Sequence, residues 1–119
     1  MNSVRRAVAR GATLLASTAL CLACLHGGAE AGDIKAGRQT AEKCATCHGF
    51  DGLGKIAEAP NIAGQNERYL IEQLSAFKTG DRKNEMMSIV IQQLSPDDIE
   101  NLAAYYSAIE VTVGKIPGQ

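Results

Sequence analysis

Apolar residues recur at helical spacing in the second half of the chain. Leu70, Leu74 and Phe77 follow one another at intervals of four and three residues, which is typical of the buried face of a helix. Asn66 stands where an N-cap is needed, and a glycine follows the last turn. The pattern therefore predicts a helix over residues 67–79.

The clearest helix start in the chain is the tetrapeptide Ser95-Pro96-Asp97-Asp98. It combines a capping serine, a proline at the first helical position and an acidic residue at the third. The helix predicted from this start runs to about residue 109, with these apolar residues facing inward: Ile99, Leu102, Tyr106 and Ile109.

A further helix is expected near the start of the same region. Asp33 is a suitable N-cap, and small or apolar residues continue at spacings of three and four up to Cys44. No segment alternates between apolar and polar residues with a period of two, so no strand is expected. The predicted fold class is all-α.

An irregular segment, residues 48–65, separates the first two predicted helices and contains four glycines and Pro60. A loop of this length is uncommon in a small domain unless it has a function. The chain also has no Trp, three Tyr and two Phe, which is few large side chains for a core of its own. Both features indicate that the chain folds around a large apolar group.

The first 31 residues have the features of a secretory signal peptide. Three arginines precede an apolar run over residues 12–25, and Ala29-Glu30-Ala31 follows. The run of 14 residues is too short to cross a bilayer core, which needs about 20. Cleavage after Ala31 is therefore expected, leaving an exported periplasmic domain of residues 32–119 without a membrane span. An uncleaved anchor and a lipoprotein are the less favoured alternatives.

Charge argues against nucleic-acid binding. The full chain has 12 basic and 13 acidic residues, and removing the leader leaves nine basic and twelve acidic residues, a net charge of −3. A nucleic-acid binder normally shows a basic excess. Removal of the leader also eliminates Cys21, Cys24 and His26, so the remaining cysteines and histidine all lie within residues 44–48.

The pentapeptide Cys44-Ala45-Thr46-Cys47-His48 has the spacing of a c-type haem attachment motif. Two thiols three residues apart can each form a thioether with a vinyl group of one haem, and the adjacent imidazole can then reach the iron. A thioredoxin-like pair would lie in a βαβ setting, and a structural zinc site needs four ligands. A simple disulfide would leave His48 without a role. One covalently attached haem c is the favoured cofactor.

The second axial position of the iron is expected to be filled by a methionine, since no other His remains. Met86 and Met87 are the candidates, and Met87 is favoured because it shares a helical face with Ile91 and Leu94. The other methionine then fills space in the core. A His/Met pair gives a six-coordinate iron with a raised reduction potential, which indicates an electron carrier rather than an enzyme. A five-coordinate haem enzyme or gas sensor is the less favoured alternative.

Taken together, these motifs resemble the class I cytochromes c, in particular the small bacterial periplasmic monohaem type and one half of the tandem dihaem type. The resemblance covers nearly all of residues 32–109. The matching segments are Gly32-Asp33 with Gly37, Cys44 to Gly49, Asp51-Gly52 with Gly54, Pro60 to Gln65, Tyr69-Leu70, Gln73-Leu74, Phe77, Gly80, Arg82, Met87-Ser88, Leu94-Ser95, Ile99, and Leu102 to Tyr106.

The resemblance implies the cytochrome c fold, in which three to five short helices wrap around one haem. It implies that the first and last helices cross, with Gly37 allowing close approach near Tyr105 or Tyr106. It also implies that the carbonyl of Pro60 accepts a hydrogen bond from Nδ1 of His48, which would hold the tautomer, and that Met87 is the axial methionine.

The function expected from this resemblance is that of a monomeric periplasmic single-electron carrier. It would dock transiently with a donor and an acceptor protein. The alternative is a haem c subunit bound to a periplasmic dehydrogenase, for example one that oxidises sulfide or an alcohol.

Overall fold

The computed structural model of the chain describes residues 31–118. The regular elements of this part are all helices, joined by loops. Its elements are α1 (Ile34–Thr40), α2 (Glu42–His48), α3 (Glu67–Thr79), α4 (Glu85–Val90), the 3₁₀ helix η1 (Ile91–Gln93) and α5 (Pro96–Ser107). The all-α prediction is confirmed. None of the helices in the described part is long and apolar enough to span a membrane. The predicted leader lies outside the described residues except for Ala31.

Capping side chains begin the helices where the sequence places them. Oδ1 of Asn66 accepts a hydrogen bond from the backbone N–H of Tyr69 at 3.0 Å, and α3 has the predicted bounds. Oγ of Ser95 accepts from the N–H of Asp98 at 3.1 Å, while the Asp98 carboxylate accepts from the N–H of Ser95 at 2.9 Å. This reciprocal pair is the capping box predicted for α5.

The first predicted helix is divided in two, which the apolar spacing did not indicate. The chain turns at Ala41, a fully buried residue between α1 and α2. The N–H of Cys44 bonds to the carbonyl of Ala41 at 2.9 Å, a three-residue closure that tightens the helix locally. Because the chain changes direction here, α2 leaves the axis of α1. Helix α5 ends at Ser107, two residues before the expected end.

Helix α1 crosses α5 at Gly37, as the resemblance implies. A Cβ at Gly37 would overlap the backbone carbonyl of Asn101 and lie 2.8 Å from Cβ of Tyr105. The backbone N–H of Asp33 also donates to Oδ1 of Asn101 at 2.6 Å. Glycine therefore lets the two helix backbones touch, and α3 packs on α5 beside this crossing.

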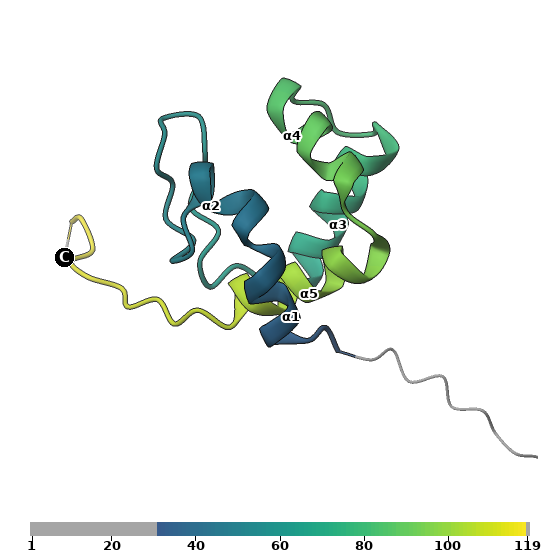
Figure 1. Cartoon of the computed structure of the whole chain (residues 1–119). Coiled ribbons are helices and arrows are strands. Elements are labelled where there is room, and N and C mark those ends of the chain that lie inside the picture. Colours follow the sequence, from purple (N-terminus) through teal and green to yellow (C-terminus); the bar gives the residue numbers. More distant parts are fainter. Residues whose placement is uncertain (1–30, 119) are drawn as a thin grey trace, which may run out of the picture.

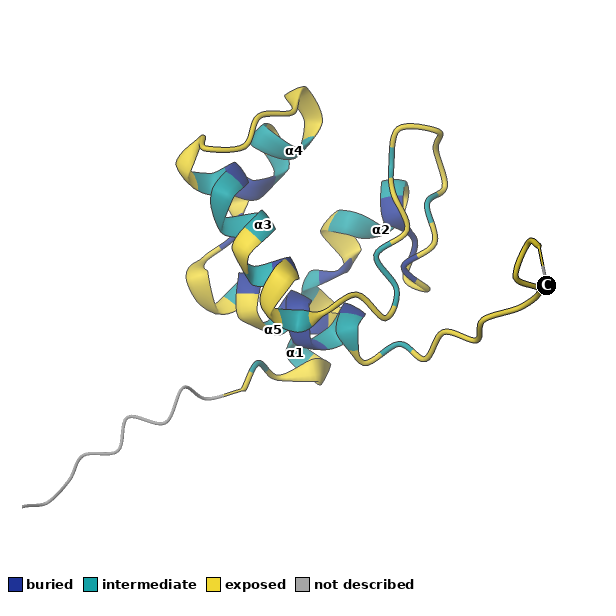
Figure 2. Cartoon of the chain, turned by 180° about the vertical axis from the view of Figure 1, so that it is seen from behind, coloured by how far each residue is buried: buried dark blue, intermediate teal, exposed yellow. Residues whose placement is uncertain are grey.

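The crossing forms the base of the molecule, and the remaining elements rise from it. Figure 1 shows α2 and its following loop on one side of α5, with α3 and α4 on the other. Buried residues gather around α5 and the elements that rest on it, whereas the C-terminal segment after α5 is largely exposed (Figure 2). The largest fully buried side chains are only Ile91 and Leu102. The protein core alone is thus small, as the aromatic content indicates.

The segment between α2 and α3 is irregular but closely tied by hydrogen bonds. The N–H of Lys55 donates to the carbonyl of Cys47 at 2.7 Å, and the N–H of Ile62 donates to the carbonyl of Gly52 at 2.7 Å. Gly52 has a φ of +68° and lies against the backbone of Ala63, so a side chain there would be both strained and crowded. The loop is therefore held in one shape.

We expect Gly37→Ala to lower the free energy of unfolding by about 2 kcal/mol or more, because its Cβ meets backbone rather than a flexible side chain. Chemical denaturation followed by far-UV circular dichroism measures this. Gly114→Ala is the control, since a Cβ at Gly114 has no atom within 4 Å. Equal stability of the two variants would contradict the close crossing.

The capping box predicts a pH dependence of stability. The N–H of Ser95, donating to the carboxylate, is the main cause that holds the pKa of Asp98 below its usual value, and the hydroxyl groups of Ser95 and Thr40 add to it. The carboxylate therefore stabilises the fold above about pH 4, and this contribution is lost as the pH falls through the folded pKa.

Asp98→Asn is expected to lower the free energy of unfolding by about 0.5–1 kcal/mol at pH 6, and the difference from the unchanged protein should shrink toward pH 2. Asp97→Asn, which removes the same charge from the same turn without breaking the capping box, is the control. A difference that stays constant down to pH 2 would exclude the ionised cap.

Candidate functional site

Helix α2 carries the two cysteines and the histidine at its C-terminal end. Cys44, Cys47 and His48 lie three and four residues apart and so share one face of the helix. The two cysteines are half-buried free thiols, and His48 is buried. Burial raises the pKa of the Cys44 thiol to about 11, with Lys43 opposing and Cys47 adding to the shift. A catalytic redox cysteine needs a lowered pKa, so the thioredoxin-like alternative is disfavoured.

The imidazole of His48 is oriented by the loop that follows α2. Its Nδ1 lies 3.0 Å from the carbonyl oxygen of Pro60, which is the contact that the resemblance implies. A carbonyl can only accept, so Nδ1 carries the proton and Nε2 keeps its lone pair for a metal. A hydrogen bond of this kind orients the ring and makes the other nitrogen a stronger ligand.

Two tyrosines of α5 hold the backbone directly after His48. The hydroxyl of Tyr106 donates to the carbonyl of Gly49 at 3.0 Å, and the hydroxyl of Tyr105 donates to the carbonyl of Phe50 at 2.7 Å. The Arg38 guanidinium also lies over the Phe50 ring, 3.7 Å from its centre. Sequence analysis placed these tyrosines at a helix crossing only. Their partners lie more than 50 residues away, so spacing carried no signal of the hydrogen bonds.

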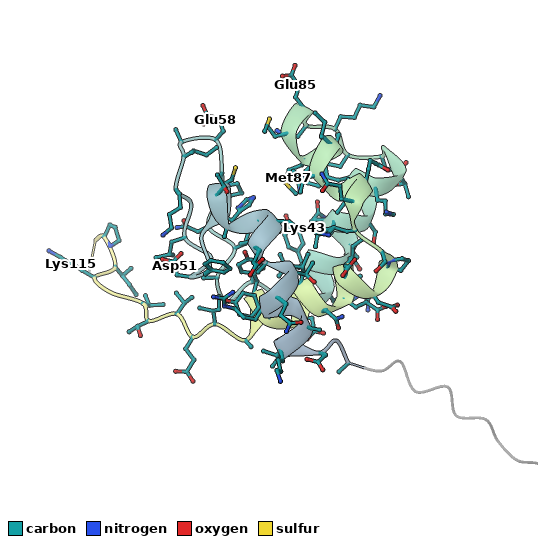
Figure 3. The ribbon with its side chains drawn as sticks, in the orientation of Figure 1. Lys43, Asp51, Glu58, Glu85, Met87 and Lys115 are labelled. Atoms are coloured by element: carbon teal, nitrogen blue, oxygen red, sulfur yellow. The ribbon has the colours of Figure 1, made fainter. Side chains whose placement is uncertain are left out.

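The two candidate methionines lie in the first turn of α4 and differ in burial. Oδ1 of Asn84 caps the helix by accepting from the N–H groups of Met86 and Met87 at 3.1 and 3.0 Å. Met87 is half-buried and packs against the hydrophobic core, whereas Met86 is 61% exposed. The expectation that the other methionine fills space in the core is therefore wrong, because Met86 faces solvent from this short helix. In Figure 3 the Met87 side chain points from α4 toward the half of the molecule that contains α2. Its orientation agrees with the choice made from helical spacing.

The donor set and the apolar surfaces fit a covalently attached haem. Two thiols and a buried imidazole nitrogen lie on α2, and a thioether sulfur faces them from α4 on the opposite side of the α5 base. Leu53 and Ile56 of the intervening loop are 45% and 44% exposed. These exposed side chains offer apolar surface against which a large apolar group could pack. These residues could therefore hold a haem, with Cys44 and Cys47 as attachment points.

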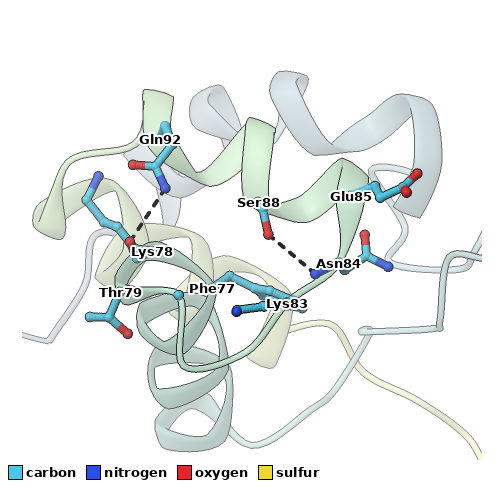
Figure 4. Close-up of a pocket in the computed structure, with 9 residues that line it drawn as sticks. Phe77, Lys78, Thr79, Lys83, Asn84, Glu85, Ser88 and Gln92 are labelled. Atoms are coloured by element: carbon cyan, nitrogen blue, oxygen red, sulfur yellow. Dashed lines mark hydrogen bonds between the residues drawn. The ribbon is translucent and has the colours of Figure 1, made fainter.

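A shallow groove lies elsewhere, between the end of α3 and α4 (Figure 4), and contains none of the candidate ligands. Lys83 lines this groove, whereas the neighbouring Arg82 side chain contacts residues of α3. The Arg82 guanidinium lies 4.5 Å from the centre of the Phe77 ring and donates to the Gln73 side chain at 2.7 Å. Arg82 is thus part of the packing of the loop after α3.

Comparison with known proteins identifies the same fold and motif. The family model described as "Cytochrome c" matches residues 34–108. Cytochrome c-554(548) of Halomonas halodenitrificans is 41% identical over 83 residues, covering 67% of this chain and all of that protein. The crystal structure of reduced recombinant cytochrome c4 from Pseudomonas stutzeri superposes with a TM-score of 0.64 at 39% identity, covering 71% of this chain and 49% of the other.

Two further relatives are longer than this chain. Cytochrome c4 of Pseudomonas aeruginosa is 38% identical over 101 residues, covering 85% of this chain, which spans 50% of that protein. A protein of Thiomonas intermedia, named thiosulfate dehydrogenase electron acceptor, is 41% identical over 71 residues. The match covers 59% of this chain and 33% of the Thiomonas intermedia protein. The chain therefore spans half or less of the length of these two relatives.

Loss of the Tyr106 hydroxyl tests how the segment after His48 is held. Tyr106→Phe is expected to lower the free energy of unfolding by about 1 kcal/mol, because the Gly49 carbonyl keeps only its bond from Gly52. Tyr69→Phe, at a side chain 45% exposed, is the matched control and should be close to neutral. Denaturant unfolding measures both, and indistinguishable values would show that the hydroxyl contributes nothing.

Proposed function

Because the chain belongs to the cytochrome c family, we propose that it carries single electrons between redox proteins on one covalently attached haem c. The haem supplies an iron that takes up one electron in passing from the ferric to the ferrous state and releases it in the reverse step. Cys44 and Cys47 would hold the group through thioether bonds. His48 and Met87 are the proposed axial ligands.

The observation that carries this proposal is the geometry of His48. The hydrogen bond from its Nδ1 to the Pro60 carbonyl presents Nε2 as the metal-binding atom, and the loop that supplies Pro60 is itself fixed by hydrogen bonds. Met87, half-buried on the opposite side, is suited to the other axial position. If His48 and Met87 both bound the iron, substrate would have no open site on it. Electron transfer, rather than catalysis, is the function that this arrangement favours.

Export to the periplasm forms part of the proposal. Residues 1–31 have the charge and apolar pattern of a leader, and cleavage after Ala31 would leave a domain with a net charge of −3. Such a domain would attract the basic face of a donor or acceptor, with association that weakens as ionic strength rises. A monomer that docks briefly is the form that suits this role.

A second candidate function is that of a haem c partner of a dehydrogenase. It is favoured by the similarity to proteins named thiosulfate dehydrogenase electron acceptor. The electron step at the iron would be the same in both cases, but the association would be lasting. The native mass of the purified protein separates the two: a monomer supports the free carrier, and co-purification with a dehydrogenase supports the second function.

Substitution of each methionine identifies the axial ligand. Met87→Ala is expected to abolish the methionine–iron absorption band of the oxidised holoprotein, lower the reduction potential and permit carbon monoxide binding to the reduced form, because it opens one axial position. Met86→Ala is the control at a neighbouring exposed side chain and should retain the band.

Two results would contradict the proposal in different ways. Retention of the band in Met87→Ala, with its loss in Met86→Ala, would move the ligand to the adjacent residue. Appreciable carbon monoxide binding by the unchanged reduced protein would instead indicate a five-coordinate haem and count against the simple carrier.

A further inference from the structure

Lysine side chains from two other helices close the end of the segment formed by α4 and η1. Nζ of Lys78, near the end of α3, donates to the backbone carbonyl of Leu94 and lies 3.5 Å from the carbonyl of Ile91. Nζ of Lys43, on α2, donates to the carbonyl of Gln93 at 3.3 Å. Three carbonyls of one turn thus face two ammonium groups.

The two ammonium groups supply hydrogen-bond donors to carbonyls at the end of a helical segment. The last carbonyls of a helix lack partners within the helix and form the negative end of its dipole. In η1 the backbone supplies one closing bond, from the N–H of Leu94 to the carbonyl of Ile91 at 3.1 Å. The ammonium groups of Lys43 and Lys78 provide charge-assisted hydrogen bonds to the carbonyls of Gln93 and Leu94. The side-chain amide of Gln92 also donates to the carbonyl of Lys78 at 3.5 Å (Figure 4). Hydrogen bonds therefore run in both directions between the end of α3 and η1.

The lysines matter for α4 because that helix has little support of its own. It spans six residues, Glu85–Val90, and a helix this short is marginal without tertiary contacts. Its first turn is capped by Asn84, and its C-terminal end continues into the turn that the lysines hold. Ile91 and Leu94 are buried in the core. The orientation of α4, and of the Met87 side chain on it, therefore depends on how this turn is fixed.

Lys43 also connects the two sides of the haem site. It precedes Cys44 on α2, and its ammonium group reaches the turn after α4. In Figure 3 its side chain lies between α2 and the half of the molecule that carries Met87. A hydrogen bond at this point relates the helix that bears His48 directly to the segment that bears the methionine.

We propose that Lys43 and Lys78 are positioning residues that set the placement of Met87 relative to His48 by holding the carbonyls of the 91–94 turn. This inference rests on the proposed function, in which Met87 is the axial ligand. Its consequence is that the methionine sulfur is harder to displace from the iron than the short helix alone would allow.

Displacement of Met87 by imidazole measures this directly in the oxidised holoprotein. Loss of the methionine–iron band is followed against imidazole concentration in Lys43→Met, Lys78→Met and the double variant. Each single variant should need about tenfold less imidazole for half-displacement, which corresponds to about one net hydrogen bond. Lys78→Arg keeps a cation with several donors and should recover most of the effect. Lys35→Met, on the exposed surface of α1, controls for loss of charge.

A variant that destabilises the fold elsewhere separates positioning from general stability. Ile99→Val, in the core of α5, is expected to cost about 1 kcal/mol in unfolding free energy without changing the half-displacement concentration by more than about twofold. Lysine variants that displace no more readily than Ile99→Val at a similar loss of stability would overturn the proposal. If Lys43→Met fails to incorporate haem, Lys78→Met with its arginine rescue is decisive alone.

Failure of this inference is distinguishable from failure of the proposed function. A band that survives in Met87→Ala removes the ligand assignment and the positioning role with it. A band that is lost in Met87→Ala, combined with unchanged imidazole displacement in the lysine variants, overturns the positioning role alone.

Discussion

The close crossing of α1 and α5 is the constraint on which the rest of the structure depends. Gly37 brings the two backbones into contact at Asn101, and α3 packs on α5 beside the crossing. The helices α2 and α4 and the 3₁₀ helix η1 are short, with seven, six and three residues. Their positions follow from this base, which holds α2 on one side and α4 on the other (Figure 1). The helix that carries His48 is thereby kept apart from the helix that carries Met87, although the protein core itself is small.

The helices that carry His48 and Met87 are each held by contacts from a distant part of the chain. On the histidine side, Tyr105 and Tyr106 of α5 hold the backbone after His48, and the Pro60 carbonyl orients the ring. On the methionine side, lysines from α2 and α3 hold the turn after α4. All of these bonds end on backbone carbonyls. The chain thus orients its site through main-chain acceptors, which any residue type can provide.

This use of the main chain explains which features could be predicted from the sequence. The bounds of α3 and the capping box of α5 follow from local hydrogen bonds between residues three apart, so the residue types reveal them. The break at Ala41 was missed because alanine favours an uninterrupted helix and only its burial marks the turn. The tyrosine and lysine contacts were missed for the same kind of reason, since a carbonyl acceptor leaves no signature in the sequence.

The sequence by itself indicated the cofactor chemistry, because Cys44, Cys47 and His48 form a local motif with the spacing of c-type haem attachment. The leader, the small number of large side chains and a candidate methionine ligand supported the same interpretation. The sequence also predicted the helices, since their periodicity and caps are local. Only the tertiary structure decided that Tyr105 and Tyr106 hold the backbone after His48, and that Lys43 and Lys78 hold the turn after α4. These relations join segments that are remote along the chain, and they arise from how α5 orders the elements in space.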